Sequence, residues 1–172
     1  MATLAIDLND RLCVVVGGGS VGRRKAGWLL SHGARVTLVE PEPLDPDETL
    51  VGHQRLSVQA CCYRPGLLDG AILVVAATDD RKINATISAD ARERGILVTR
   101  VDSGVESQVI FPALLEAGNS VVAVHSHGLD CLSSKGLRDH IASGLGLRAP
   151  GPLYFEPGAV EPHDDGGTGN DA

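Results

Sequence analysis

A short apolar run that leads directly into a glycine-rich turn constrains this 172-residue chain more than any other feature. The run is Leu12–Val16 (LCVVV), and the turn that follows it is Gly17–Gly22 (GGGSVG). A continuous apolar run of this length is typical of a strand buried on both faces of a parallel sheet. A helical pattern then extends to about His32 and ends at Gly33. Together these segments predict a strand, a tight turn and a helix.

The turn fits the pattern G-x-G-x-x-G through Gly17, Gly19 and Gly22. Gly17 would allow the tight turn, Gly19 the close approach of backbone amides to a pyrophosphate, and Gly22 the close packing of helix and strand. The N-terminus of the helix presents unpaired N–H groups to phosphates, so Ser20 and Val21 belong to the expected site. The context of strand, turn and helix predicts a dinucleotide cofactor.

A second short strand, Val36–Val39, ends at Glu40. A carboxylate at this point accepts hydrogen bonds from an adenosine ribose and repels a 2′-phosphate, which favours NAD over NADP. The alternative is a glycine-rich turn without a ligand, with Glu40 as a solvated charge. The three cations of residues 23–25 lie in the first helical turn, where the helix dipole disfavours positive charge. They indicate either a nearby anion or a solvated face.

The remainder of the first hundred residues continues the alternation of strands and helices. Its strand-like runs are Leu56–Cys62, Ala71–Ala76 and Ile96–Val101. Between the last two, Thr78, Asp79 and Asp80 supply N-cap oxygens for a second helix, and Thr78 and Asp79 belong to the expected cofactor site. With a loop at Pro41–Asp47, this order predicts a Rossmann-like doubly wound parallel α/β domain over residues 1–102.

The second part of the chain, residues 103–147, has a different pattern. Val109–Phe111 and Ser120–Val124 are expected to be strands, and Asp130–Ala142 a helix. Such a small α+β appendage buries little core alone, so we expect it to pack on the first domain or to serve dimerisation. Residues 148–172 are acidic and rich in Gly and Pro, and are expected to be a disordered tail.

Charge and hydropathy exclude several classes of protein. The formal net charge is −7, which argues against a nucleic-acid partner because such binding needs a basic face. No apolar run reaches the ~18–20 residues that span a bilayer. The N-terminus lacks the pattern of a signal peptide. These observations predict a cytoplasmic protein with no membrane partner.

The four cysteines form no CxxC motif, so they do not by themselves indicate a disulfide framework or a metal site. They are Cys13, Cys61, Cys62 and Cys131. A disulfide framework is not expected in the cytoplasm, and buried thiols are favoured over metal ligation, although a metal is left open.

Several segments in the correct order resemble one known family. They are residues 12–25 (LCVVVGGGSVGRRK), 76–80 (AATDD), 101–102 (VD), 110–112 (IFP) and 122–124 (VAV). Over residues 5–143 the chain resembles the precorrin-2 dehydrogenase and sirohydrochlorin ferrochelatase family, the dehydrogenase module of siroheme synthases. The resemblance implies oxidation of precorrin-2 to sirohydrochlorin with NAD⁺ as the hydride acceptor, by a homodimer with a swapped dimerisation region.

The resemblance assigns Asp102 as the catalytic residue. Its position after the fifth strand agrees, because ligands of such folds bind at the carboxyl edge of the sheet, where a carboxylate can take a proton. The alternative is a turn or capping aspartate before residues 103–104. In the region that follows the VAV strand, the resemblance implies that Ser126 lies on the substrate side, flanked by two histidines that depart from the family pattern. Those histidines, His125 and His127, would bind a metal or a substrate carboxylate, or would be ordinary loop residues.

The carboxylate-rich tetrapyrrole also requires cations. The candidates are Arg100, Lys135, Arg138 and Arg148. Most of the helical C-terminal domain of the family is not expected here, which would leave the substrate site more open. Alternatives to a dehydrogenase are a bifunctional dehydrogenase and ferrochelatase, an NAD-binding regulatory module without turnover, and a redox-inactive scaffold in a larger siroheme complex.

Overall fold

The structure, a computed structural model, describes residues 2–42, 50 and 52–148. Its first part is a five-stranded sheet with all strand pairs parallel. The strands are β1 (Leu12–Val16), β2 (Arg35–Val39), β3 (Leu56–Gln59), β4 (Leu73–Ala76) and β5 (Leu97–Arg100). Their order in the sheet is β3-β2-β1-β4-β5, so the chain reverses direction of winding between β1 and β4. This confirms the predicted Rossmann-like fold and places its ligand crevice at the carboxyl ends of those two strands.

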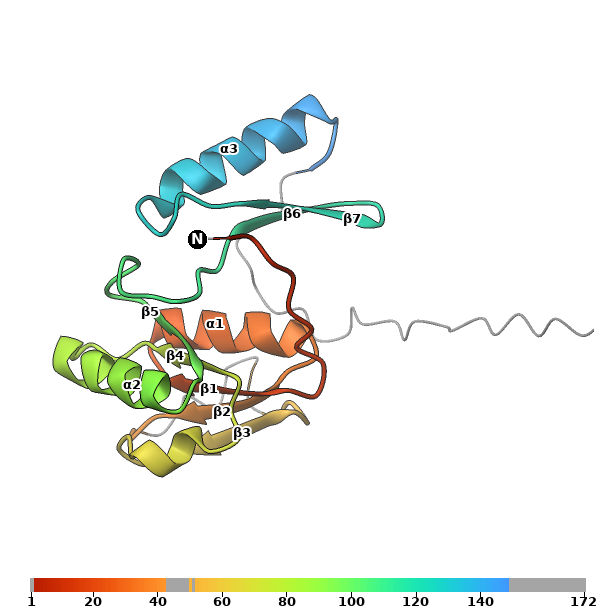
Figure 1. The fold of residues 1–172 in the computed structure, drawn as a ribbon. Helices are drawn as coiled ribbons and strands as arrows, with labels where there is room; N and C mark the ends of the chain where they lie inside the picture. Colours follow the sequence, from red (N-terminus) through yellow and green to blue (C-terminus); the bar gives the residue numbers. More distant parts are fainter. Residues whose placement is uncertain (1, 43–49, 51, 149–172) are drawn as a thin grey trace, which may run out of the picture.

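Strand β1 is apolar throughout because both of its faces are buried. Cys13 and Val15 pack with one cluster that includes α1 (Ser20–Ser31), whereas Val14 and Val16 pack with another that includes α2 (Arg81–Glu93). The one-turn helix η1 (Pro65–Leu68) belongs to the second cluster through Leu68. Figure 1 shows α1 between the sheet and the remaining part of the molecule. The helices therefore cover both faces of the sheet.

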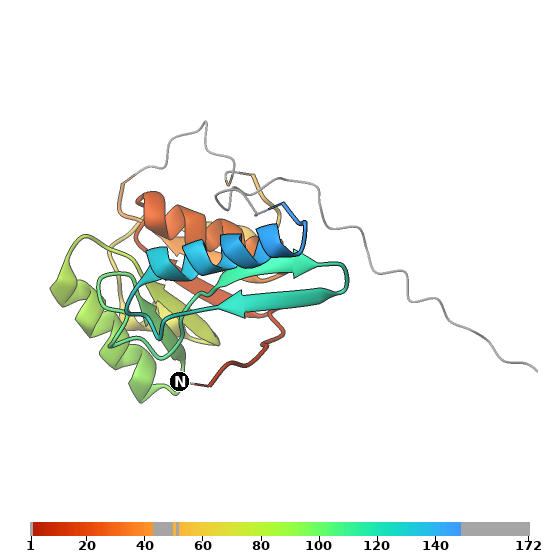
Figure 2. The ribbon, with the colours of Figure 1, turned by 90° about the horizontal axis from the view of Figure 1, so that it is seen from above.

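The second part is a two-stranded antiparallel hairpin covered by one helix. Its elements are β6 (Ala113–Ala117), β7 (Ser120–Val124) and α3 (Cys131–Gly144). Figure 2 shows α3 lying along the hairpin. Asp130 caps the helix, since its Oδ1 accepts from the backbone N–H groups of Leu132 (2.9 Å) and Ser133 (3.0 Å). We call this unit the appendage.

The expected strand at Val109–Phe111 is wrong. This segment is irregular, and β6 begins only after Pro112. The backbone N–H groups of Gln108 and Val109 both turn toward Val98 O, at 2.8 and 3.2 Å, so they do not form a regular ladder. The Val109 and Phe111 side chains instead pack against the core cluster beneath α1.

Smaller differences concern the ends of elements and the thiols. The strand expected at residues 56–62 stops at Gln59, where it runs along the exposed edge of the sheet.

Cys13 is buried, as expected, but Cys62 and Cys131 are exposed and Cys61 is half-buried. The expectation of buried thiols is therefore wrong for the last three.

Two expectations concern parts of the chain that lie mostly outside the described residues. These are the loop at 41–47, of which 41–42 are described, and the tail at 148–172, of which only Arg148 is described. Among the described residues, no helix is long and apolar enough to cross a membrane.

Candidate active site

The glycine loop joins β1 to α1 with two positions that tolerate no side chain. Gly17 has φ +108°, and a Cβ there would lie 2.3 Å from the Ala77 carbonyl oxygen. A Cβ on Gly22 would lie 1.9 Å from the Gly17 carbonyl oxygen. A Cβ on Gly19, in contrast, would meet no described atom within 4 Å. The fold thus requires glycine at positions 17 and 22, whereas position 19 faces open space.

The N-terminus of α1 differs from those of the other two long helices. Asp80 caps α2 through Oδ1, which accepts from Lys82 N at 2.7 Å, and Asp130 caps α3. At α1 the N-cap is Gly19, and within the described residues no side chain caps the helix. The N–H groups of its first turn, which begins with Ser20 and Val21, are therefore available to a ligand, and the helix dipole favours an anionic one.

A cavity of about 290 Å³ adjoins the loop at the carboxyl edge of the sheet. We call it the loop cavity. It is lined by five residues of the expected cofactor site, namely Gly17, Gly19, Glu40, Thr78 and Asp79. Further lining residues include Cys61, Cys62, Tyr63 and Ile83. Its position at the switch point of the strand order is the position where dinucleotides bind in such sheets.

Glu40 lies against the glycine loop. Its Oε2 accepts a short hydrogen bond from the backbone N–H of Gly18, and its Oε1 accepts one from Glu42 N at 3.3 Å. The carboxylate is therefore fixed beside the turn, with lone pairs remaining for further donors such as ribose hydroxyls.

Asn84 is a central residue of the site that the sequence analysis missed. It is fully buried in α2, and its Oδ1 accepts from Thr78 N at 3.0 Å and from Thr78 Oγ1 at 2.8 Å. Its Nδ2 donates to Thr78 O at 2.9 Å and to Asp102 Oδ1 at 3.2 Å. Position 84 shares the buried face of the helix with Ile87 and Ala91. A polar residue on this apolar face is the sequence signal that could have identified Asn84 as a site residue.

Asp102 follows β5 and carries a strongly paired carboxylate. Arg100 donates from Nε to Oδ1 at 3.2 Å and from Nη2 to Oδ2 at 2.7 Å. Arg81 Nε lies 3.4 Å from Oδ2. The hydrogen bonds from Arg100, above all other causes, hold the pKa of Asp102 below its ordinary value. Arg100 itself is buried and also pairs with Glu106, so the expectation that it is a cation open to the substrate is wrong.

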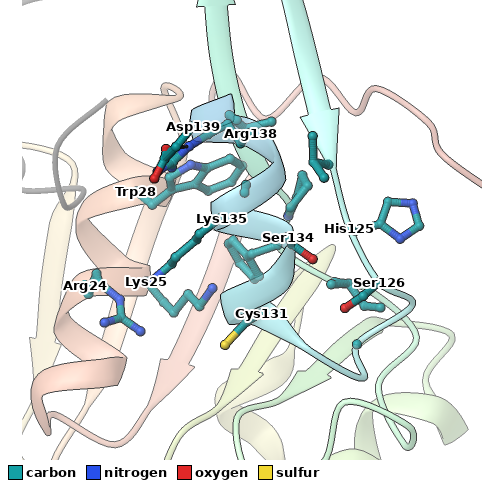
Figure 3. Close-up of a pocket in the computed structure, with 17 residues that line it drawn as sticks. Arg24, Lys25, Trp28, His125, Ser126, Cys131, Ser134, Lys135, Arg138 and Asp139 are labelled. Atoms are coloured by element: carbon teal, nitrogen blue, oxygen red, sulfur yellow. Dashed lines mark hydrogen bonds and ion pairs between the residues drawn. The ribbon is translucent and has the colours of Figure 1, made fainter. Parts of the chain in front are cut away.

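A larger cavity, of about 490 Å³, lies between α1, the hairpin and α3. We call it the appendage cavity. Figure 3 shows Arg24, Lys25 and Trp28 of α1 on one side of it, and Lys135 and Arg138 of α3 on the other. Arg138 Nε also donates to Asp139 Oδ1 at 2.8 Å. The cavity thus combines a cluster of cations with the aromatic rings of Trp28 and Phe111.

The ammonium group of Lys25 has an altered pKa in this cavity. Its ammonium nitrogen lies 3.8 Å from the centroid of the Phe111 ring. Burial first, and then the nearby charges of Arg24 and Lys135, lower its pKa from 10.5 to about 8. An anion in the cavity would relieve both the repulsion and part of the cost of burial.

The residues expected on the substrate side are brought together only in part. His125, Ser126, Lys135 and Arg138 line the appendage cavity, whereas His127 does not line it. The Ser126 hydroxyl is engaged with the backbone of Asp130, donating to its O at 2.6 Å and accepting from its N at 2.7 Å.

The two histidines lie beyond the end of β7. His125 Nε2 is 3.0 Å from Thr3 Oγ1, and His125 Nδ1 accepts from His127 N at 3.3 Å. Across the described residues, no group of three or more His, Cys, Asp or Glu side chains is arranged to hold a metal ion. Asp102 lines neither cavity but is joined to the loop cavity through Asn84 and Thr78.

The fold and the glycine loop together define a dinucleotide-binding α/β domain, and comparison with known proteins agrees. Residues 4–113 match the family model described as putative NAD(P)-binding, so the chain belongs to that family. The expectation of a nicotinamide dinucleotide is thereby confirmed at the level of NAD(P).

Curated relatives narrow the assignment. The chain is 39% identical over 138 residues to the siroheme synthase of Chromobacterium violaceum, covering 80% of this chain and 29% of that protein. It is 42% identical over 141 residues to siroheme synthase 2 of Aeromonas hydrophila, with coverages of 80% and 29%. The resemblance seen in the motifs is confirmed, and the chain spans less than a third of the length of these relatives.

A solved structure carries the same fold. It is "SirC, precorrin-2 dehydrogenase", with a TM-score of 0.72 and 24% sequence identity over 84% of this chain and 71% of that one. At this identity the likeness establishes the fold.

Proposed function

We propose that this chain catalyses the NAD-dependent dehydrogenation of precorrin-2 to sirohydrochlorin in the formation of siroheme. The observation that carries the proposal is the Asp102 carboxylate, which Asn84 connects to Thr78 at the wall of the loop cavity, in a relative of siroheme synthases. In the division that we propose, residues 1–102 hold the cofactor, residues 103–147 serve the substrate side and dimerisation, and residues 148–172 form a tail.

The residues present fit NAD. The uncapped N-terminus of α1, with Ser20 and Val21, and the open position at Gly19 would receive the pyrophosphate. Glu40 would accept hydrogen bonds from the ribose hydroxyls. Thr78 and Asp79, which follow β4, would line the same cavity beside the cofactor. When bound, NAD⁺ supplies the hydride acceptor of the reaction.

The role of Asp102 follows from the balance of the oxidation. Conversion of precorrin-2 to sirohydrochlorin removes two electrons and two protons, which leave as a hydride and a proton. An ionised carboxylate beside the loop cavity is suited to take that proton. Because Arg100 keeps the pKa of Asp102 low, the carboxylate begins each turnover without a proton of its own.

The appendage cavity suits the carboxylates and the macrocycle of a tetrapyrrole. Lys25, Lys135 and Arg138 would pair with carboxylates, and Trp28 offers an aromatic surface. His125 and Ser126 would line the same side, with His127 at its margin.

A second copy of the chain is the proposed partner. Large apolar side chains of the appendage are exposed, namely Val121, Leu129, Leu132 and Leu137, of which Leu129 and Leu132 are 75% exposed. Cover by a second appendage would remove them from water.

The net charge of −7 supports a protein that binds neither nucleic acid nor an anionic membrane surface, and we place it in the cytoplasm.

Anaerobic turnover tests the function. The protein is mixed with metal-free precorrin-2 and NAD⁺, and the absorbances of sirohydrochlorin and NADH are followed together. The proposal predicts that both appear in equal amounts, and that Asp102→Asn binds NAD but forms both at least about 100-fold more slowly. Binding of NAD without turnover by the unmodified chain would instead indicate a binding module and would contradict the proposal.

A further inference from the structure

Within the described residues, the carboxylate of Asp102 has hydrogen-bond and ion-pair partners from two elements. Arg100 of β5 donates to both oxygens, Asn84 of α2 donates to Oδ1, and Arg81 of α2 lies against Oδ2. Arg100 and Asn84 make three hydrogen bonds to the carboxylate, whereas Arg81 makes an ion pair with Oδ2 at 3.4 Å. Oδ1 therefore accepts two side-chain hydrogen bonds, whereas Oδ2 accepts one and is otherwise covered by the Arg81 side chain.

The donors differ greatly in burial. The side chain of Arg100 is 7% exposed and Asn84 is fully buried, whereas the side chain of Arg81 is 77% exposed. Arg81 also has the longest contact, at 3.4 Å. Because exposed ion pairs are weak and buried charge-assisted hydrogen bonds are strong, Arg81 is the partner of Asp102 that leaves most easily.

The two buried donors are themselves fixed. The Oδ1 of Asn84 accepts two hydrogen bonds from Thr78, so its Nδ2 must face Asp102. Arg100 is held at its other nitrogen by the carboxylate of Glu106, and its backbone N–H donates to Ser107 Oγ at 2.8 Å. Neither side chain can turn away without leaving a buried polar group unpaired.

We propose that Arg100 and Asn84 are positioning residues that fix Asp102, and that Arg81 leaves Oδ2 to bind a carboxylate of the incoming substrate. This division of roles rests on the proposed function, because it assumes an acidic substrate whose proton passes to Asp102. Oδ2 is then the reacting oxygen, and entry of the substrate itself uncovers it. The charged groups that face Asp102 are Arg100, Arg81 and, through Arg100, Glu106.

The first experiment needs no substrate. The Asp102 side-chain carboxyl is titrated by ¹³C NMR in the full chain, with Asp102→Asn used to assign the signal. Replacement Arg100→Met should raise the midpoint by about 1–3 pH units, while Arg81→Gln should move it by only a few tenths. As a control, Arg55→Gln removes a partly exposed arginine that pairs with Asp10, and should leave the midpoint unchanged. Equal shifts for Arg100→Met and Arg81→Gln would overturn the assignment of roles.

The second experiment separates binding from catalysis. Arg81→Gln should raise the KM for precorrin-2 about 3- to 10-fold, consistent with loss of one exposed charge pair, with a smaller effect on kcat. Arg100→Met should lower kcat and move the acidic limb of its pH profile upward by the shift seen in the titration. A fall in kcat at constant KM for Arg81→Gln would contradict the role of substrate ligand.

Two further outcomes are distinguishable. If Arg100→Met does not fold, as judged by circular dichroism, Arg100→Lys takes its place. Lysine keeps the positive charge but cannot make both hydrogen bonds of the guanidinium to Asp102, so kcat should still fall. An unchanged kcat in Arg100→Lys would overturn the positioning role. If no variant, including the unmodified chain, turns over precorrin-2, the proposed function fails together with the role of Arg81. The titration then still decides whether Arg100 fixes Asp102.

Discussion

The ammonium nitrogen of Lys25 lies 3.8 Å from the centre of the Phe111 ring, so the helix that follows the glycine loop directly contacts the segment that leads into the appendage. Lys25 also lines the appendage cavity together with Lys135. The contact joins the proposed cofactor half of the molecule to the proposed substrate half.

Lys25 predicts a pH dependence of tetrapyrrole binding. Its lowered pKa of about 8 means that the ammonium is charged at pH 7 and is mostly neutral at pH 9. Sirohydrochlorin, measured by anaerobic absorbance titration, should therefore bind more weakly at pH 9 than at pH 7, by about 3- to 10-fold. In Lys25→Met the binding should already be weak at pH 7 and change little with pH. An unaltered pH dependence in the variant would show that another group is responsible.

The glycine loop predicts two opposite phenotypes. Gly22→Ala places a Cβ against the Gly17 carbonyl and should destabilise the fold by about 2–4 kcal/mol, like other overpacked sites. Gly19→Ala meets no described atom and should change the free energy of unfolding by less than about 1 kcal/mol. It should nevertheless weaken NAD binding at least tenfold, because the methyl group would stand where the pyrophosphate approaches. Urea unfolding and NAD titration measure the two effects, and normal NAD binding by Gly19→Ala would contradict the placement of the phosphates.

Glu40 predicts the choice of cofactor. Glu40→Ser should weaken NAD binding and strengthen NADP binding, so that the ratio of the two affinities falls at least tenfold, since repulsion of the 2′-phosphate is removed. Fluorescence titration with both dinucleotides measures the ratio. Glu42→Gln is the matched control, because Glu42 contacts Glu40 through its backbone N–H, which the substitution keeps. If the two variants behave alike, Glu40 does not set the preference.

The exposed side chains of the appendage predict an effect on assembly. Leu129→Lys with Leu132→Lys should convert a dimer to a monomer in sedimentation velocity, because both leucines are 75% exposed in the single chain. Val105→Lys is the control, since Val105 is equally exposed but lies outside the appendage strands and helix. A monomeric unmodified chain, or a dimer that survives the double substitution, would contradict a dimer built on this face.

Sequence reasoning succeeded where a local pattern is sufficient. β1 was predicted with its observed ends because both faces are buried and glycine follows at once, and Asp80 caps α2 as its position suggested. The strand β6 was missed because Val109 and Phe111, which looked like a strand, are apolar through contact with the core rather than through pairing.

The contacts of the site were less predictable than the fold. The joining of Asn84 to Asp102 across 18 positions depends on how α2 packs against β5. The pairing of Arg100 with Glu106 depends in the same way on the loop after β5. Nothing in the local sequence distinguishes such partners from solvated polar residues. The Ser126 hydroxyl likewise proved to be bound to the backbone of its own turn.

The role of Asp102 is tested by a single-turnover comparison between the unmodified chain and Asp102→Asn, each saturated with NAD⁺ and mixed anaerobically with a limiting amount of precorrin-2. If Asp102 takes the proton, NADH formation should be at least about 100-fold slower in the variant, while its Kd for NAD stays within about threefold. An Asp102→Asn variant that forms NADH at the unmodified rate would contradict the central claim.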